Sequence, residues 1–146
     1  MAAARRCRYR LVPESRHHAG VATTAEIVEA YWIFHRLSTG TRPERLRSED
    51  YFWAWEEINH VLEDGTPHEG LNLLDALLHA PETDPGTIGA GCLEDLLYSR
   101  PAEVGDQVAT RARRDERWRQ ALDHVYVPDE VLPLLPDELR LYLAPR

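Results

Sequence analysis

Lysine is absent from the sequence, and all 17 of its basic side chains other than histidine are arginines. A phosphate-binding Walker loop requires a lysine before a serine or threonine, so this class of nucleotide site is excluded. Long apolar runs are also missing. No stretch approaches the roughly 20 apolar residues that cross a bilayer, and residues 1–20 lack the apolar segment of a secretory signal. We therefore expect a cytoplasmic protein without a membrane partner.

Residues that build metal and redox sites are few and scattered. The two cysteines, Cys7 and Cys92, lack the close spacing of a zinc site or a redox pair, so both are expected to be free thiols. None of the seven histidines lies four residues from another on a predicted helix, and no G-x-S-x-G nucleophile motif occurs. The sequence therefore predicts neither a metal nor a cofactor.

Carboxylates outnumber arginines, and the excess is unevenly distributed. The net charge is −8, although residues 1–21 contain five arginines and one glutamate. Residues 22–146 therefore carry 12 arginines against 24 carboxylates, a formal charge of −12. Because nucleic acids are bound mainly through Lys and Arg contacts to phosphates, this composition disfavours a nucleic-acid partner. It favours a protein partner with a basic surface.

The change of charge near residue 21 also predicts the domain organisation. We expect a basic, flexible extension over residues 1–21 and one helical domain over residues 22–146, because 146 residues suit a single core. The extension either stays mobile or folds back on the acidic body. An arm that binds nucleic acid or an acidic partner is the alternative.

Helix start and stop signals recur from Thr23 onward, and no segment alternates as a strand. Thr23 and Glu26 have capping-box spacing, as do Thr66 and Glu69, and Pro67 suits a first helical turn. The predicted helices cover residues 23–40, 49–65, 67–80, 86–99, 101–113 and 115–127, with short pieces up to residue 143. The predicted fold is all-α, a single domain of about six short antiparallel helices. Stacked hairpins resembling an α-solenoid are one possible arrangement.

The segment 88–97, IGAGCLEDLL, has glycines spaced as in a dinucleotide loop. Such a loop needs a preceding hydrophobic strand and a third glycine, and this segment has neither. We therefore predict a helix whose buried face contains Gly89 and Cys92 with the leucines, and whose other face contains Gly91, Glu94, Asp95 and Tyr98. Because a mid-helix glycine costs about 1 kcal/mol relative to alanine, Gly91 indicates either a close-packed neighbour or a bound partner.

The same segment carries a resemblance to a known family. Together with the later segment 108–127, it resembles an uncharacterised family of small bacterial helical proteins with an A-G-P-L-E-D-L-L run and a following aromatic-x-x-x-L pattern. Cys92 stands where that run has proline, and Trp118 stands at the aromatic position. The similarity covers about residues 51–126. Since the family has no assigned activity, the resemblance implies a helical fold and nothing about chemistry.

Three classes of function stay open. The first is a non-enzymatic protein-interaction module, for which Gly91, Glu94, Asp95 and the three tryptophans are the candidate structural or interaction residues. These tryptophans are Trp53, Trp55 and Trp118. The second is an acidic immunity-type or inhibitor protein that neutralises a basic toxin or nuclease.

The third class is a small enzyme. Its acid/base site would be formed by Glu94 and Asp95 with a histidine from another helix, either His60 or His124. Under the structural interpretation, Glu94 is expected to reach a helix N-terminus or an arginine within residues 113–117. Core packing is the alternative interpretation for the tryptophans.

Overall fold

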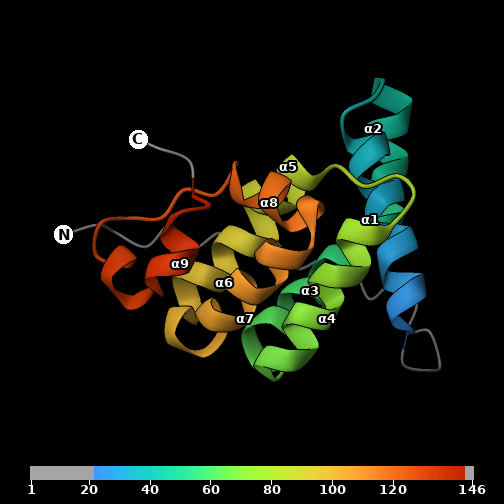
Figure 1. The fold of residues 1–146 in the computed structure, drawn as a ribbon. Coiled ribbons are helices and arrows are strands. Elements are labelled where there is room, and N and C mark those ends of the chain that lie inside the picture. Colours follow the sequence, from blue (N-terminus) through green and yellow to red (C-terminus); the bar gives the residue numbers. More distant parts are fainter. Residues whose placement is uncertain (1–21, 144–146) are drawn as a thin grey trace.

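The computed structural model describes residues 22–143, which form a single compact all-α domain (Figure 1). The predicted basic extension at residues 1–21 and the last three residues, 144–146, lie outside the described residues. Within the described range, no strand occurs and no helix is long and apolar enough to cross a membrane. The all-α fold class predicted from the sequence is confirmed.

The helical segments follow one another with short connections. They are α1 (Thr24–Ser38), α2 (Arg42–Ser48), the 3₁₀ turn η1 (Glu49–Tyr51), α3 (Phe52–Asp64), α4 (Pro67–His79), α5 (Pro85–Ile88), the π-helical turn η2 (Gly89–Leu93), α6 (Glu94–Ser99), α7 (Pro101–Arg114), α8 (Glu116–Leu122), the 3₁₀ turn η3 (Leu132–Leu134) and α9 (Asp137–Arg140).

Two of the capping boxes expected from the sequence begin helices as predicted. At the start of α1 the backbone N–H of Thr23 donates to Glu26 Oε2 over 2.8 Å, and at the start of α4 that of Thr66 donates to Glu69 over 2.7 Å. A third capping box, at Thr41, begins α2, which the sequence analysis missed. This seven-residue helix has no apolar stripe, and Leu46 within it is 61% exposed.

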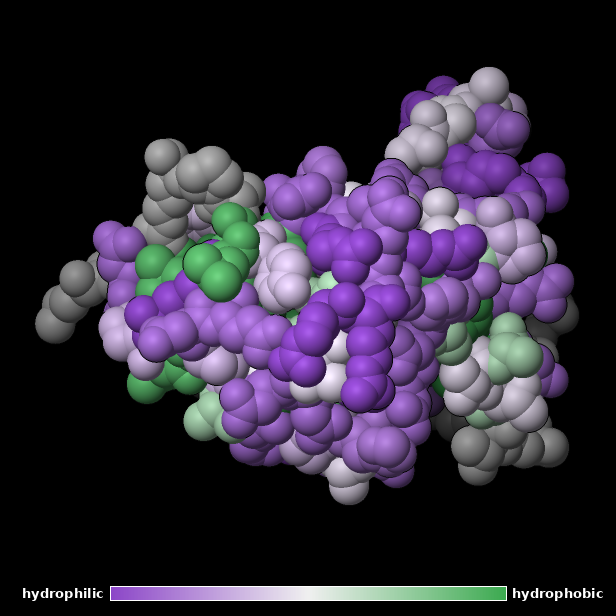
Figure 2. Space-filling model, in the orientation of Figure 1, coloured by the Kyte–Doolittle hydropathy of each residue, from purple (hydrophilic) through white to green (hydrophobic). Residues whose placement is uncertain are grey.

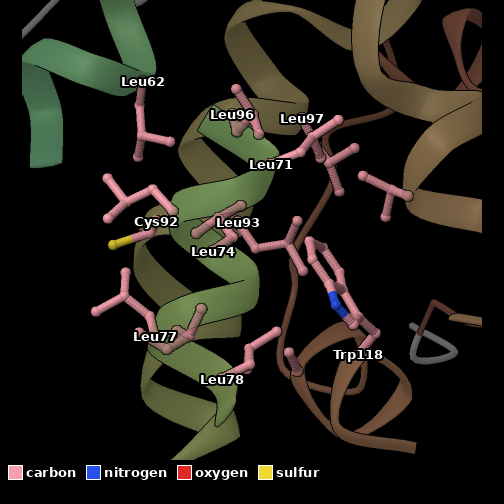
Figure 3. Packing of buried hydrophobic residues seen from close by; sticks show 14 of the residues in the cluster. Leu62, Leu71, Leu74, Leu77, Leu78, Cys92, Leu93, Leu96, Leu97 and Trp118 are labelled. Atoms are coloured by element: carbon pink, nitrogen blue, oxygen red, sulfur yellow. The ribbon is translucent and has the colours of Figure 1, made fainter. Parts of the chain in front are cut away.

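Helix α4 occupies the centre of the domain and contacts α1, α3, α5, α7 and α8. Its leucines Leu71, Leu74, Leu77 and Leu78 are fully buried. Figure 3 shows these side chains packed against the leucines of η2 and α6, with Leu71 beside Leu97 and Leu78 at the opposite end, so the two helical segments run antiparallel. A solenoid repeat touches only its neighbours along the chain, whereas these helices share one central helix.

Helix α4 is fixed to α7 and α8 by a polar network around Asp75. One carboxylate oxygen accepts from the indole N–H of Trp118 over 2.7 Å, and the other accepts from Nε of Arg111 over 3.0 Å. The Arg111 guanidinium also lies 5.7 Å from the centre of a Trp118 ring. Beside them, His79 Nε2 is 2.7 Å from Asp115 Oδ2. Every polar group in this network therefore has a partner, which favours a structural role.

The surface is mostly hydrophilic in the view of Figure 2, over α4, α7 and α8. Hydrophobic side chains gather on the left of that view, over the C-terminal segment that includes α9. Within this segment Leu134 is 56% and Leu141 is 84% exposed. On this face, the exposed apolar side chains therefore gather near the end of the described chain.

Candidate functional site

The glycine-containing segment is helical, as predicted, but it is not one regular α-helix. Residues 85–99 form α5, the π-helical turn η2 and α6 in succession. The expected division of faces is confirmed, because Gly89, Cys92 and Leu93 are buried while Asp95 and Tyr98 are exposed. Nothing in the side-chain pattern separates a π turn from an α turn, so the sequence analysis missed it.

The two glycines of η2 differ in what surrounds them. A Cβ atom at Gly89 would collide with the backbone carbonyl group of Ala121 in α8, so the absence of a side chain allows these two helices to touch. A Cβ atom at Gly91 would meet no atom of residues 22–143 within 4 Å. The structure therefore shows a close-packed neighbour at Gly89 and open space at Gly91.

Cys92 faces the interior beside Tyr31 of α1. It is a free cysteine, and burial raises the pKa of its thiol to about 11. Burial, followed by the neighbouring Cys92, also raises the pKa of the Tyr31 hydroxyl above its ordinary value. Both groups therefore stay protonated at neutral pH, and the thiol is a poor nucleophile.

Carboxylates line the outer face of α3. Residues 49–64 contain six carboxylates and no arginine, and all six are exposed. They form three adjacent pairs, at residues 49 and 50, 56 and 57, and 63 and 64. Because the pairs are seven residues apart, about two helical turns, they align along the helix. With Glu94 and Asp95 of α6 they form what we call the α3–α6 acidic surface: Glu49, Asp50, Glu56, Glu57, Glu63, Asp64, Glu94 and Asp95.

Within the described residues, the one ion pair on this acidic surface joins His60 Nδ1 to Asp64 Oδ2 over 3.0 Å. The other seven carboxylates have no cationic partner there. Unpaired charges of one sign create a local field that attracts a basic surface.

A hollow of about 250 Å³ lies between α3 and α6, inside the acidic surface. It is lined by Asn59, Leu62, Glu63, Asp95, Tyr98 and Ser99. The pKa of Asp95 is raised, first by partial burial and then by the negative charges of Glu94 and Glu63. The hollow therefore holds carboxylates that no cation among residues 22–143 pairs with.

Glu94 makes a different contact from the one expected. Its Oε2 accepts a hydrogen bond of 2.8 Å from the backbone N–H of Tyr126, in the segment after α8. The predicted contact of Glu94 with an arginine or a helix N-terminus is therefore wrong. Arg113 pairs with Glu138, and Arg117 donates to a backbone carbonyl of α4. Glu94 thus fixes the chain after α8 to the beginning of α6.

The histidines of the enzymatic alternative have their contacts elsewhere. His60 pairs with Asp64 on the outside of α3, and the His124 ring packs against Gly86 at the start of α5. Neither ring lines the hollow that contains Asp95. Among the residues 22–143, no group of three or more metal-ligating side chains is placed to hold an ion.

The three tryptophans occupy different environments. Trp118 is completely buried, so the core interpretation is correct for it. Trp53 and Trp55 are partly buried in α3 and pack against the core cluster, and the Trp55 ring stacks on Phe52 with 5.2 Å between ring centres. The aromatic residues of α3 therefore anchor the helix whose outer face is acidic.

Tyr98 was expected on the same helix face as Asp95, but sequence reasoning missed Glu63 and Asn59 as neighbours of Asp95. These two residues come from α3, more than 30 residues earlier in the chain, and only the packing of α3 against α6 brings them to Asp95. The signal that was available is the absence of arginine from residues 49–64.

A second, larger hollow of about 450 Å³ lies between α8 and residues 141–143. Glu116, Asp123 and Arg119 all line it, so its charges are of both signs. The Arg119 guanidinium donates to the Ala112 carbonyl over 2.6 Å. This hollow lacks the single-sign character of the α3–α6 acidic surface.

No protein-family model, no curated protein and no solved structure matches the chain. The resemblance of residues 51–126 to a bacterial helical family therefore stays a prediction.

Proposed function

We propose that the protein is a non-enzymatic interaction module that binds the basic surface of a protein partner through the α3–α6 acidic surface. The observation that carries this proposal is the alignment of six exposed carboxylates on residues 49–64 without an arginine among them. The formal charge of −12 on residues 22–146 also favours binding of a basic partner. An immunity-type or inhibitor role towards a basic toxin or nuclease is the form of this function that fits best.

Charge complementarity of this kind mainly raises the rate of association and selects the partner. Because the six carboxylates are solvent-exposed, salt screens their attraction, with a Debye length of about 8 Å at physiological ionic strength. The aromatic anchoring of α3 supports the proposal, since it holds the helix in place without the help of salt bridges. The expected setting, taken from the sequence alone, is a bacterial cytoplasm.

The test is affinity capture from a lysate of the native host. The immobilised wild-type protein is compared with the triple variant Glu49→Gln/Glu56→Gln/Glu57→Gln. A matched control, Asp106→Asn/Glu116→Gln/Asp123→Asn, removes the same charge from exposed positions in α7, in α8 and directly after α8.

We expect the wild type and the control to retain one basic protein at low salt. The triple variant at positions 49, 56 and 57 should not retain this partner, and high salt should release the partner from the wild type. Equal loss with both variants would show that net charge alone is responsible. Capture of nucleic acid instead of a protein would also contradict the proposal.

The enzymatic alternative receives no support from a specific observation. It needs Glu94 and Asp95 beside His60 or His124, and the structure gives each of these histidines a contact outside the hollow.

A further inference from the structure

We propose that the hollow between α3 and α6 receives one arginine side chain of the protein partner. This inference rests on the proposed function and makes it specific, because it assigns a single recognition point within the acidic surface. The hollow of about 250 Å³ is smaller than the 300–1,000 Å³ typical of small-molecule sites. Its size therefore suits one side chain better than a cofactor.

The lining combines the groups that a guanidinium requires. Glu63 and Asp95 supply carboxylates, which bind the planar guanidinium fork through paired hydrogen bonds. Tyr98 is 58% exposed, and its ring offers a face on which a guanidinium stacks. Leu62 supplies apolar surface for the methylene groups of the arginine stem. Lysine matches this lining less well, because its ammonium neither stacks as a plane nor binds two oxygens as a fork.

Within residues 22–143, no arginine of the chain occupies this hollow. Arg100 follows directly after the hollow residue Ser99, but its guanidinium is already engaged. It donates to the carbonyl of Gly65 over 2.6 Å and to Glu103 over 3.2 Å. The backbone carbonyl of Asp95 accepts from the Ser99 hydroxyl over 2.8 Å, but its side-chain carboxylate has no hydrogen bond or ion pair within the described residues, and its raised pKa is consistent with this lack of compensation.

Gly91 provides the space that a partner backbone would need. It precedes Asp95 by four residues, about one helical turn, so the two positions share a face of η2 and α6. No atom of the described part of the chain lies within 4 Å of the place where its Cβ would be. A mid-helix glycine that serves no internal packing is explained if the partner chain approaches the helix backbone there.

The experiment uses the full-length ¹⁵N-labelled protein and the peptide N-acetyl-Gly-Arg-Gly-amide as the probe, followed by chemical-shift changes of backbone amides. A peptide with citrulline in place of arginine keeps the shape and removes the charge. We expect the arginine peptide to shift the amides around the hollow, including those of Glu63, Asp95 and Tyr98. The citrulline peptide should produce no such shifts.

Two double variants locate the recognition point. Glu63→Gln/Asp95→Asn should weaken arginine-peptide binding by about tenfold or more, the effect of losing charged hydrogen bonds. Glu56→Gln/Glu57→Gln removes the same charge from α3 outside the hollow and should leave the affinity within about twofold, the effect of a screened surface charge. Circular dichroism confirms that both variants are folded.

Three results would overturn the inference: no binding of the arginine peptide, equal binding of the citrulline peptide, or equal weakening by the two double variants. Equal weakening by the two double variants would leave the acidic surface as the binding region without a specific arginine site, and it would not affect the outcome of the capture experiment. Failure of the capture experiment together with a positive peptide titration would instead contradict the macromolecular partner and leave the arginine site.

Discussion

Alanine substitutions at the two glycines of η2, only two residues apart, should change the stability of the protein in opposite directions. In Gly89→Ala the new methyl group would lie 2.7 Å from the Ala121 carbonyl carbon and 3.1 Å from its Cα, with the carbonyl oxygen closer still. These are backbone atoms of α8, so relief requires moving that helix together with the buried Trp118. Overpacking of this kind costs about 1–3 kcal/mol, and we place this case at the upper end.

Helix propensity offsets part of that cost. Alanine is better than glycine in a helix by about 1 kcal/mol, which leaves a net loss of about 1–2 kcal/mol for Gly89→Ala. With about 2.1 cal/mol/K of unfolding entropy per residue, a chain of 146 residues changes its Tm by about 3 °C per kcal/mol. The Tm of Gly89→Ala should therefore fall by about 3–6 °C.

Gly91→Ala should have the opposite effect. Because no atom lies within 4 Å of the new Cβ, only the propensity term operates. A gain of about 0.5–1 kcal/mol corresponds to a rise in Tm of about 2–3 °C.

Both variants are measured by thermal and urea denaturation followed by far-UV circular dichroism. A Gly89→Ala protein as stable as the wild type would refute the close contact with α8. A clearly destabilised Gly91→Ala protein would refute the open space at that position. If Gly91→Ala gains stability but binds the arginine peptide more weakly, the open position serves binding.

Three further predictions concern single side chains. Asp75→Ala leaves the indole N–H of buried Trp118 without its acceptor, so urea denaturation should show a loss of about 1–3 kcal/mol; an unchanged midpoint would contradict the structural role of that network. Because the pKa of Asp95 is raised in the fold, its stabilising contribution is complete below the unfolded pKa of about 4 and is lost as the pH rises through the folded pKa. Asp95→Asn should therefore be more stable than the wild type at pH 7 and equally stable at about pH 3, and the reverse order would show that a cation of the chain already compensates the carboxylate. In a Cys7→Ser background, Cys92 should react with iodoacetamide at pH 8 far more slowly than a free thiol, because it is buried and its pKa is about 11; rapid labelling without unfolding would place the thiol at the surface.

Local signals in the sequence were sufficient for most helix positions. The capping boxes at Thr23 and Thr66 could be identified from the sequence as the starts of α1 and α4, because the required side chains lie three residues apart in the chain. Helix α2 was missed because apolar periodicity was the main criterion and this short helix has none. The beginning of α3 was placed three residues early, since the 3₁₀ turn η1 carries the same acidic first-turn residues as a helix start.

The candidate site was less accessible to sequence reasoning. Glu94 and Asp95 lie on one helix as expected, with Asp95 exposed and Glu94 partly buried, but their neighbours depend on tertiary packing. The contact of Glu94 with the Tyr126 backbone involves no side-chain signal at position 126, so nothing in the sequence indicates it. Likewise, Glu63 and Asp95 line the same hollow only because α3 packs against α6.

The central position of α4 has a consequence for how the chain can be divided. This helix contacts α1 and α3, which precede it, and α5, α7 and α8, which follow it. A fragment ending in the loop at residues 81–84 would retain α4 but expose the leucines that η2, α6 and α8 cover, and the complementary fragment would lack the surface on which it packs. Neither half is therefore an autonomous folding unit. Co-expressed as separate chains, the two fragments should complement each other into one soluble complex, since each supplies the apolar face that the other leaves uncovered.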